Sequence, residues 1–202
     1  TNSNSEGSAG LVLESGASFI HAVNNVQATA HCVIPGTANN WHLLASPVAT
    51  QAIADNFIPA GTSYDFYAWD EPSEMWLNQK VAANNLTAFI PGSGYLVAYA
   101  LPDTKSFTGG LNNGNITFNL KYSATGNYKG ANLMGNPYPS GIDWHLANRG
   151  QFQDNFAYAY NPGKAGGEGY EAIDGALENA YIGCSQGFFV LAKQDQNNQP
   201  FT

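Results

Sequence analysis

The chain has 202 residues, a formal net charge of −8 and only 11% charged residues. Its seven Lys and Arg residues provide no basic surface for nucleic-acid phosphates or an anionic bilayer, and no apolar run approaches the length of a membrane-spanning helix. Aromatic residues make up 13% of the chain, which excludes a disordered chain because so many rings can form a folded core.

Short segments rich in aromatic and β-branched residues, bounded by Gly, Pro or Asn, predict a succession of β-strands. Only residues 48–56 and 144–153 fit single helical turns. Residues 1–10 are polar and predict a linker, so the folded domain should span residues 11–202. The predicted strands are, in chain order, residues 11–13, 18–21, 26–33, 65–69, 95–99, 116–120, 156–160 and 188–191.

An internal repeat organises these elements. The segment Trp41–Val48 (WHLLASPV) aligns with Ala131–Tyr138 (ANLMGNPY), and Gly94–Ala98 aligns with Gly187–Leu191. Further short matches follow the same order along the chain, with offsets that drift as small loop insertions would produce. We therefore predict two copies of one unit within a single domain, at about residues 19–100 and 107–192.

Many short strands separated by Gly, Pro and Asn turns predict an all-β fold, and we expect a β-sandwich built from two repeated units related by a pseudo-twofold axis. Cys32 and Cys184 lie in different copies. The sequence leaves open whether they form a disulfide or remain thiols. A bridge would require the copies to touch, which would favour one joint core.

The sequence lacks the patterns of common hydrolases, metalloenzymes and phosphate-binding enzymes, and its four histidines are isolated. Carboxylates between Asp65 and Glu74 lie among aromatic residues, and glycosidases use two carboxylates that flank a sugar. The second copy, however, has Asn161 where the first has Asp70. We therefore expect a non-catalytic protein without a cofactor. The oxygen-rich surface would also suit a structural calcium ion, for which the sequence identifies no ligands.

Ligand recognition explains the same aromatic segment better than catalysis does. Flat rings stack on the apolar faces of sugars, while Asp, Asn and Gln side chains bind hydroxyl groups. We expect aromatic residues that recur in both copies to fill the core more often than not, and the copy-specific Trp76 and Tyr170 to lie in loops at 71–78 and 163–175. The candidate ligand-binding residues are Trp76, Tyr64, Trp69, Asp70, Glu71, Asn78, Gln79 and Tyr170.

Three strings carry a resemblance to a known family: WHLLASPV at 41–48, GNPYPSGIDW at 135–144 and GFFV at 187–190. They resemble a module common in large secreted or surface proteins of Bacteroidota-type bacteria. The resemblance implies an extracellular or cell-surface location and an accessory role within a larger multidomain chain. It assigns no role to individual residues.

These observations favour an extracellular carbohydrate-binding module that tethers a larger secreted enzyme to polysaccharide, such as plant cell-wall glycan. The alternative is a cell-surface adhesion or structural spacer domain. Neither hypothesis involves nucleic acid or a membrane as partner.

Overall fold

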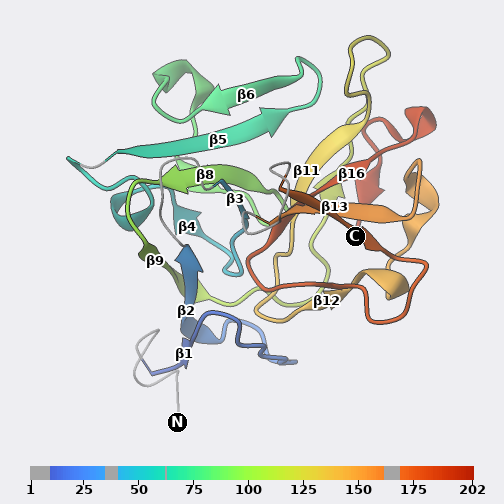
Figure 1. Cartoon of the computed structure of the whole chain (residues 1–202). Coiled ribbons are helices and arrows are strands. Elements are labelled where there is room, and N and C mark those ends of the chain that lie inside the picture. Colours follow the sequence, from blue (N-terminus) through green and yellow to red (C-terminus); the bar gives the residue numbers. More distant parts are fainter. Residues whose placement is uncertain (1–9, 35–40, 62, 162–168) are drawn as a thin grey trace.

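The computed structural model describes residues 10–34, 41–61, 63–161 and 169–202. These residues form β-strands in several sheets, connected by loops and short 3₁₀ turns, so the predicted all-β fold is confirmed (Figure 1). None of their helical turns has the length and apolar character needed to cross a membrane. Residues 1–9 of the predicted linker lie outside the described residues. The 3₁₀ turns are η2 (Asp55–Phe57), η3 (Ala82–Asn84), η4 (Trp144–Leu146), η5 (Arg149–Gln151) and η6 (Gln194–Gln196).

Two antiparallel four-stranded sheets form the centre of the structure, one in each predicted copy. The first sheet has the order β3-β8-β5-β6 and the second has the order β11-β16-β13-β14, so the strands of the two sheets follow the same connectivity. The first sheet contains β3 (His42–Leu44), β8 (Tyr95–Tyr99), β5 (Tyr64–Asp70) and β6 (Met75–Asn78). The second contains β11 (Ala131–Gly135), β16 (Gly187–Leu191), β13 (Phe156–Tyr160) and β14 (Tyr170–Asp174).

Smaller sheets accompany the four-stranded ones. A three-stranded sheet has the order β1-β2-β9, in which β1 runs parallel to β2 and β9 runs antiparallel to it. Three antiparallel pairs complete the fold: β4 with β7, β12 with β15, and β10 with β17. Their bounds are β1 (Val12–Leu13), β2 (Gln27–Ile34), β9 (Asp103–Gly110), β4 (Gln51–Ala52), β7 (Ala88–Phe89), β12 (Ile142–Asp143), β15 (Tyr181–Ile182), β10 (Phe118–Asn119) and β17 (Pro200–Phe201).

The buried apolar side chains form two clusters, one against each four-stranded sheet. The first combines Phe107 of β9 with Phe66 of β5, so this core lies between the three-stranded sheet and the first four-stranded sheet. The second combines Phe201 of β17 with Phe188 of β16. This arrangement differs from the single joint core that a disulfide between the copies would favour, and both cysteine thiols are free.

Reciprocal backbone hydrogen bonds join the two copies. The N–H of Ala45 donates to the carbonyl of Ser185 at 2.9 Å, and the N–H of Gly135 donates to the carbonyl of Gly92 at 2.9 Å. In the repeat alignment Ala45 corresponds to Gly135, and Ser185 corresponds to Gly92. A twofold relation between the copies would produce this reciprocity, because each partner surface then makes the same contact.

Three local predictions were wrong. Residues 18–21 form no strand; Phe19 makes one backbone hydrogen bond, to Pro139, and Ile20 is 87% exposed because no neighbouring strand pairs with it. Trp76 lies in strand β6 and Tyr170 begins strand β14, where we expected loops. Both strands are the outer arms of hairpins, and pairing with β5 and β13 orders them.

Candidate functional site

A groove lined by aromatic rings lies where the β5–β6 hairpin of the first copy meets the second four-stranded sheet. Its volume is about 430 Å³. Both copies contribute to it, so it depends on how they associate. We call this site the aromatic groove; its lining residues are Trp69, Trp76, Tyr128, Ala131, Tyr158, Tyr170, Phe189 and Leu191.

The first wall of the groove is a cross-strand pair of tryptophans. Trp69 of β5 is opposite Trp76 of β6, with ring centroids 5.1 Å apart and planes at 62°. The indole Nε1 of Trp69 donates to the carbonyl of Ala131 at 2.6 Å, which attaches the hairpin to β11 of the other copy. The hydrogen bond fixes the polar atom of the indole and leaves the ring to form the wall.

The second wall is formed by Tyr170, which packs against Tyr160 in the corresponding hairpin of the second copy. Tyr160 of β13 is opposite Tyr170 of β14, with centroids 5.2 Å apart and planes at 83°. Because Trp69–Trp76 and Tyr160–Tyr170 occupy the same place in sheets of the same order, Trp76 and Tyr170 are structural counterparts. The sequence analysis was wrong to treat them as specific to one copy.

A single ring on the floor connects the two walls. Phe189 of β16 lies 5.9 Å from Trp69, 6.0 Å from Trp76 and 6.2 Å from Tyr170, measured between centroids. The strand period directs Phe189 outward while its neighbours Phe188 and Val190 enter the core, where they are 1% and 0% exposed.

Access to the groove is open on the side of its tyrosines. Tyr128 is 63% exposed and Tyr170 is 40% exposed. Tyr128 is held beside Trp69 because the carboxylate of Glu74 accepts the backbone N–H groups of Asn127 and Tyr128. Exposed rings in fixed positions are what a ligand with apolar faces requires.

Polar groups surround the groove sparsely. The hydroxyl of Tyr158 donates to Asp154 at 2.8 Å. Burial, followed by the hydrogen bond to Asp154 and the negative charge of that residue, raises the pKa of Tyr158 to about 12. Burial and the neighbouring Tyr160 likewise raise the pKa of Tyr170. Both hydroxyls therefore stay protonated at physiological pH, and that of Tyr158, which donates its proton to Asp154, can still accept a hydrogen bond.

The structure brings three of the eight predicted ligand-binding residues together, namely Trp69, Trp76 and Tyr170. Asp70 and Glu71 line a separate hollow of about 230 Å³, which Trp69 also borders. Both carboxylates already accept hydrogen bonds from the protein. Asp70 accepts from the backbone N–H and the hydroxyl of Ser73, and so stabilises a turn.

Glu71 supports the fold. It is only 3% exposed, and its Oε1 accepts from the N–H and hydroxyl of Ser123 and from the N–H of Gly130, at 2.7 to 2.9 Å. These partners lie more than 50 residues away in sequence. The carboxylate thus anchors the β5–β6 hairpin to the segment that leads into β11.

The remaining three candidates lie elsewhere on the first copy. Tyr64 and Gln79 line a hollow of about 490 Å³, where the hydroxyl of Tyr64 donates to Gln79 at 2.9 Å. Asn78 donates to the hydroxyl of Tyr67 at 3.3 Å and accepts the N–H of Lys80 through its side-chain oxygen. These residues do not reach the aromatic groove.

Sequence reasoning missed Tyr128, Tyr158 and Phe189. Tyr158 was expected to fill the core more often than not, yet it points outward, because Ala157 and Ala159 take the inner positions of β13 at 0% and 3% exposure. The alternation of alanine with rings in residues 156–160 was the signal that could have identified this outer face.

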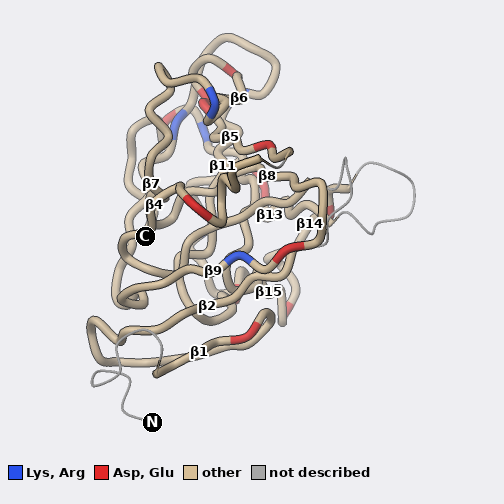
Figure 2. Tube along the Cα trace, turned by 90° about the vertical axis from the view of Figure 1, so that its left-hand side faces the viewer, with Lys and Arg blue, Asp and Glu red and all other residues tan. Residues whose placement is uncertain are grey.

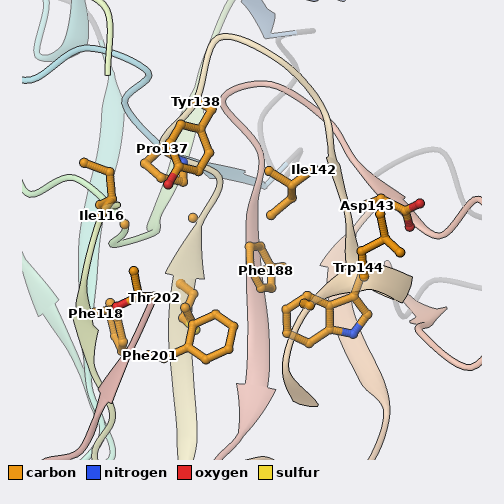
Figure 3. A pocket seen from close by; sticks show the side chains of 15 residues that line it. Ile116, Phe118, Pro137, Tyr138, Ile142, Asp143, Trp144, Phe188, Phe201 and Thr202 are labelled. Carbon is orange, nitrogen blue, oxygen red and sulfur yellow. The ribbon is translucent and has the colours of Figure 1, made fainter. Parts of the chain in front are cut away.

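A smaller apolar pocket of about 240 Å³ opens over the second core. Figure 3 shows rings of Phe118, Phe188 and Phe201 around it, with the carboxylate of Asp143 directed away from them. Asp143 accepts the backbone N–H of His145 and so caps η4. The lining of this smaller pocket offers few groups that could orient a polar ligand, so the aromatic groove is the stronger candidate for a ligand-binding site.

Charged residues make up only 11% of the chain. Charge is spread thinly along the chain (Figure 2). No three His, Cys, Asp or Glu side chains in this part of the chain lie close enough to hold a metal ion. Asp65, near Tyr67, accepts the hydroxyl of that residue and forms an ion pair with Lys80 at 3.7 Å.

Comparison with known proteins gives one match. A family model described as a domain of unknown function (DUF8693) matches residues 2–149, which include the whole first copy and the start of the second. No curated protein and no solved structure matches the chain.

Proposed function

We propose that this chain, which belongs to the family described as a domain of unknown function (DUF8693), binds polysaccharide without cleaving it. The observation that carries the proposal is the aromatic groove, in which rings from both copies converge on one open site of about 430 Å³. A carbohydrate presents flat C–H faces with hydroxyls at their edges, and such a site offers rings with a few polar groups around them.

The geometry of the rings supports this ligand class. Trp76 and Tyr170 form opposite walls, each held by a cross-strand ring partner, so little conformational entropy would be lost when a sugar packs against them. The hydroxyl of Tyr158, which donates its proton to Asp154, can accept a hydrogen bond beside the rings. The carboxylate of Asp154 provides a further acceptor and would repel acidic glycans.

The state of the carboxylates supports binding rather than hydrolysis. Glycosidases require one carboxylic acid and one carboxylate on either side of the scissile bond. Near the groove, Glu71 is buried with three donors on one oxygen, and Glu74 accepts two backbone N–H groups. Neither group is placed to attack or protonate a sugar in the groove.

In this proposal the module acts outside the cell as part of a larger chain. By attachment to an insoluble or long glycan it would raise the local substrate concentration for a linked enzyme. The resemblance to modules of secreted and surface proteins and the low content of charged residues support this location.

Fluorescence titration with soluble β-glucan, xylan and mannan tests the proposal. Trp69 and Trp76 line the groove, whereas Trp144 is 1% exposed in the second core. We expect at least one polysaccharide to shift the tryptophan emission and to retard the protein in affinity electrophoresis. Trp76→Ala should weaken this binding about tenfold, which corresponds to about 1.4 kcal/mol.

The matched control is Tyr181→Ala, since Tyr181 is 58% exposed and does not line the groove. This variant should bind as the wild type does, and both variants should unfold cooperatively. If none of a broad panel of neutral glycans changes the emission or mobility of the wild type, the proposal fails and the adhesion or spacer alternative takes its place.

A further inference from the structure

The outer face of strand β5 carries a second aromatic residue beside the groove. Tyr67 lies two residues before Trp69, and the period of a strand places both side chains on the same face of the sheet. Strand β5 runs toward the second copy (Figure 1), so Tyr67 lies farther from that copy than Trp69 does. The ring of Trp41 lies 6.1 Å from that of Tyr67.

Polar side chains border these two rings closely. The hydroxyl of Tyr67 donates to Asp65 and accepts from the amide of Asn78, both at 3.3 Å. Tyr67 and Trp41 are both half-buried, so part of each ring meets solvent. We call this surface the β5 patch; it consists of Trp41, Asp65, Tyr67 and Asn78.

The β5 patch continues the aromatic groove without a gap in the strand. Along β5 the outward residues are Asp65, Tyr67 and Trp69, and Trp69 is itself the wall of the groove. The Trp41–Tyr67 pair thus lies on the same strand face as the ring cluster of the groove, in which neighbouring centroids are 5.1 to 6.2 Å apart. A ligand of one or two sugar units would contact only part of this surface.

We infer that the site takes an internal stretch of a linear polysaccharide, which lies in the aromatic groove and passes over the β5 patch. The inference rests on the proposed function and specifies the form of its ligand. Rings supply apolar contact at both ends of this path, in the groove and at the Trp41–Tyr67 pair. Asp65 and Asn78 supply an acceptor and a donor for hydroxyls at the end where the groove itself has few polar groups.

Calorimetry with gluco-, xylo- and manno-oligosaccharides of two, four and six units tests the inference. The affinity of the wild type should rise with chain length up to the longest member. Tyr67→Ala should weaken binding of the six-unit oligosaccharide about tenfold and leave binding of the two-unit one unchanged, because the short ligand occupies the groove alone. Trp76→Ala should weaken binding of both.

Two further variants keep the result interpretable. Tyr67→Phe retains the ring and should reduce affinity for the six-unit oligosaccharide less than Tyr67→Ala does, even if the alanine variant folds poorly. Tyr181→Ala should have no effect at any length. Two outcomes would overturn the extended-chain inference alone. One is an affinity that does not depend on the length of the oligosaccharide. The other is that Tyr67→Phe and Tyr67→Ala bind every length as the wild type does, while Trp76→Ala binds more weakly. Absence of binding to every polysaccharide by the wild type would instead overturn the proposed function.

Discussion

The two four-stranded sheets share one strand order but fill their cores differently. In the first copy the inward position of β5 holds Phe66, which packs against Phe89 and Tyr95 at 5.6 and 5.5 Å. The corresponding position of β13 holds Ala157. Both cores also receive a ring from a 3₁₀ turn, Phe57 of η2 in the first and the larger Trp144 of η4 in the second. The same backbone frame therefore accepts side chains of different size at corresponding inner positions.

The outer faces show the opposite behaviour. The hairpin pair Trp69–Trp76 and its counterpart Tyr160–Tyr170 keep nearly equal centroid distances, 5.1 and 5.2 Å, although these rings face solvent in part. Inner rings can be exchanged where the core volume is kept. Under the proposed function, the outer rings keep a fixed place because they meet a ligand.

The largest effect should come from emptying either core. Phe66→Ala and Trp144→Ala should each lower the free energy of unfolding by about 3–5 kcal/mol, because both side chains are fully enclosed, at 0% and 1% exposure. Denaturant unfolding measures the change. Since the two residues belong to separate clusters, the effects should add in the double variant. A double variant markedly more stable than the sum predicts would show that the cores are energetically coupled.

Removal of the anchor between the copies should have the next largest effect. Glu71→Ala leaves the N–H of Gly130 and the donors of Ser123 without a partner, which should cost about 3 kcal/mol. Glu74→Ala, a matched change at a half-buried carboxylate of the same hairpin, should cost about 1 kcal/mol or less. Thermal unfolding of both variants tests this ranking, and equal losses would contradict the anchoring role of Glu71.

Adjacent carboxylates show what sequence could and could not predict. Asp70 and Glu71 are neighbours in sequence, so pattern reasoning assigned them one role. Glu71 is nevertheless buried because Ser123 and Gly130, more than 50 residues along the chain, supply its donors. A residue whose burial depends on distant partners cannot be recognised from its own neighbourhood.

The alternation of residues along the strands, in contrast, was enough to predict much of the fold and part of the aromatic groove. The repeat motifs placed the equivalent strands, and the alternation in β5 separated Phe66 from Tyr67 and Trp69. It could not show which face meets the core, since both faces of β5 carry rings. Tyr128 belongs to no strand and is positioned by Glu74, so no periodic pattern predicted it.

A smaller loss of stability is expected at alkaline pH, where the buried ionisable groups titrate. Burial, and then the charge of Cys184, raises the pKa of the Cys32 thiol from 9.0 to about 12. Above pH 9 the unfolded chain loses this proton while the folded chain retains it, so the contribution to stability is present below pH 9 and is lost as pH rises toward 12. Tyr158 acts in the same direction above pH 10.

Unfolding free energies measured by urea titration at several pH values test this effect. They should be level from about pH 7 to 9 and fall above that range. Cys32→Ser should make the alkaline decline less steep, and Tyr158→Phe should remove its part above pH 10. A decline with the same slope in both variants would assign the effect to other groups.

The smallest expected effect concerns whether a disulfide cross-links the two copies. Cys32 and Cys184 are free thiols, so apart from the peptide chain itself the copies are held together by non-covalent contacts, such as the reciprocal backbone bonds at Ala45 and Gly135. Dithiothreitol should therefore leave Tm unchanged. A disulfide would close a loop of about 150 residues and add about 5 kcal/mol in the chain-entropy estimate, so its reduction would lower Tm by many degrees. If Tm fell in the wild type but not in Cys184→Ser, a disulfide, and not the reciprocal backbone hydrogen bonds alone, would hold the two walls of the groove in their relative positions.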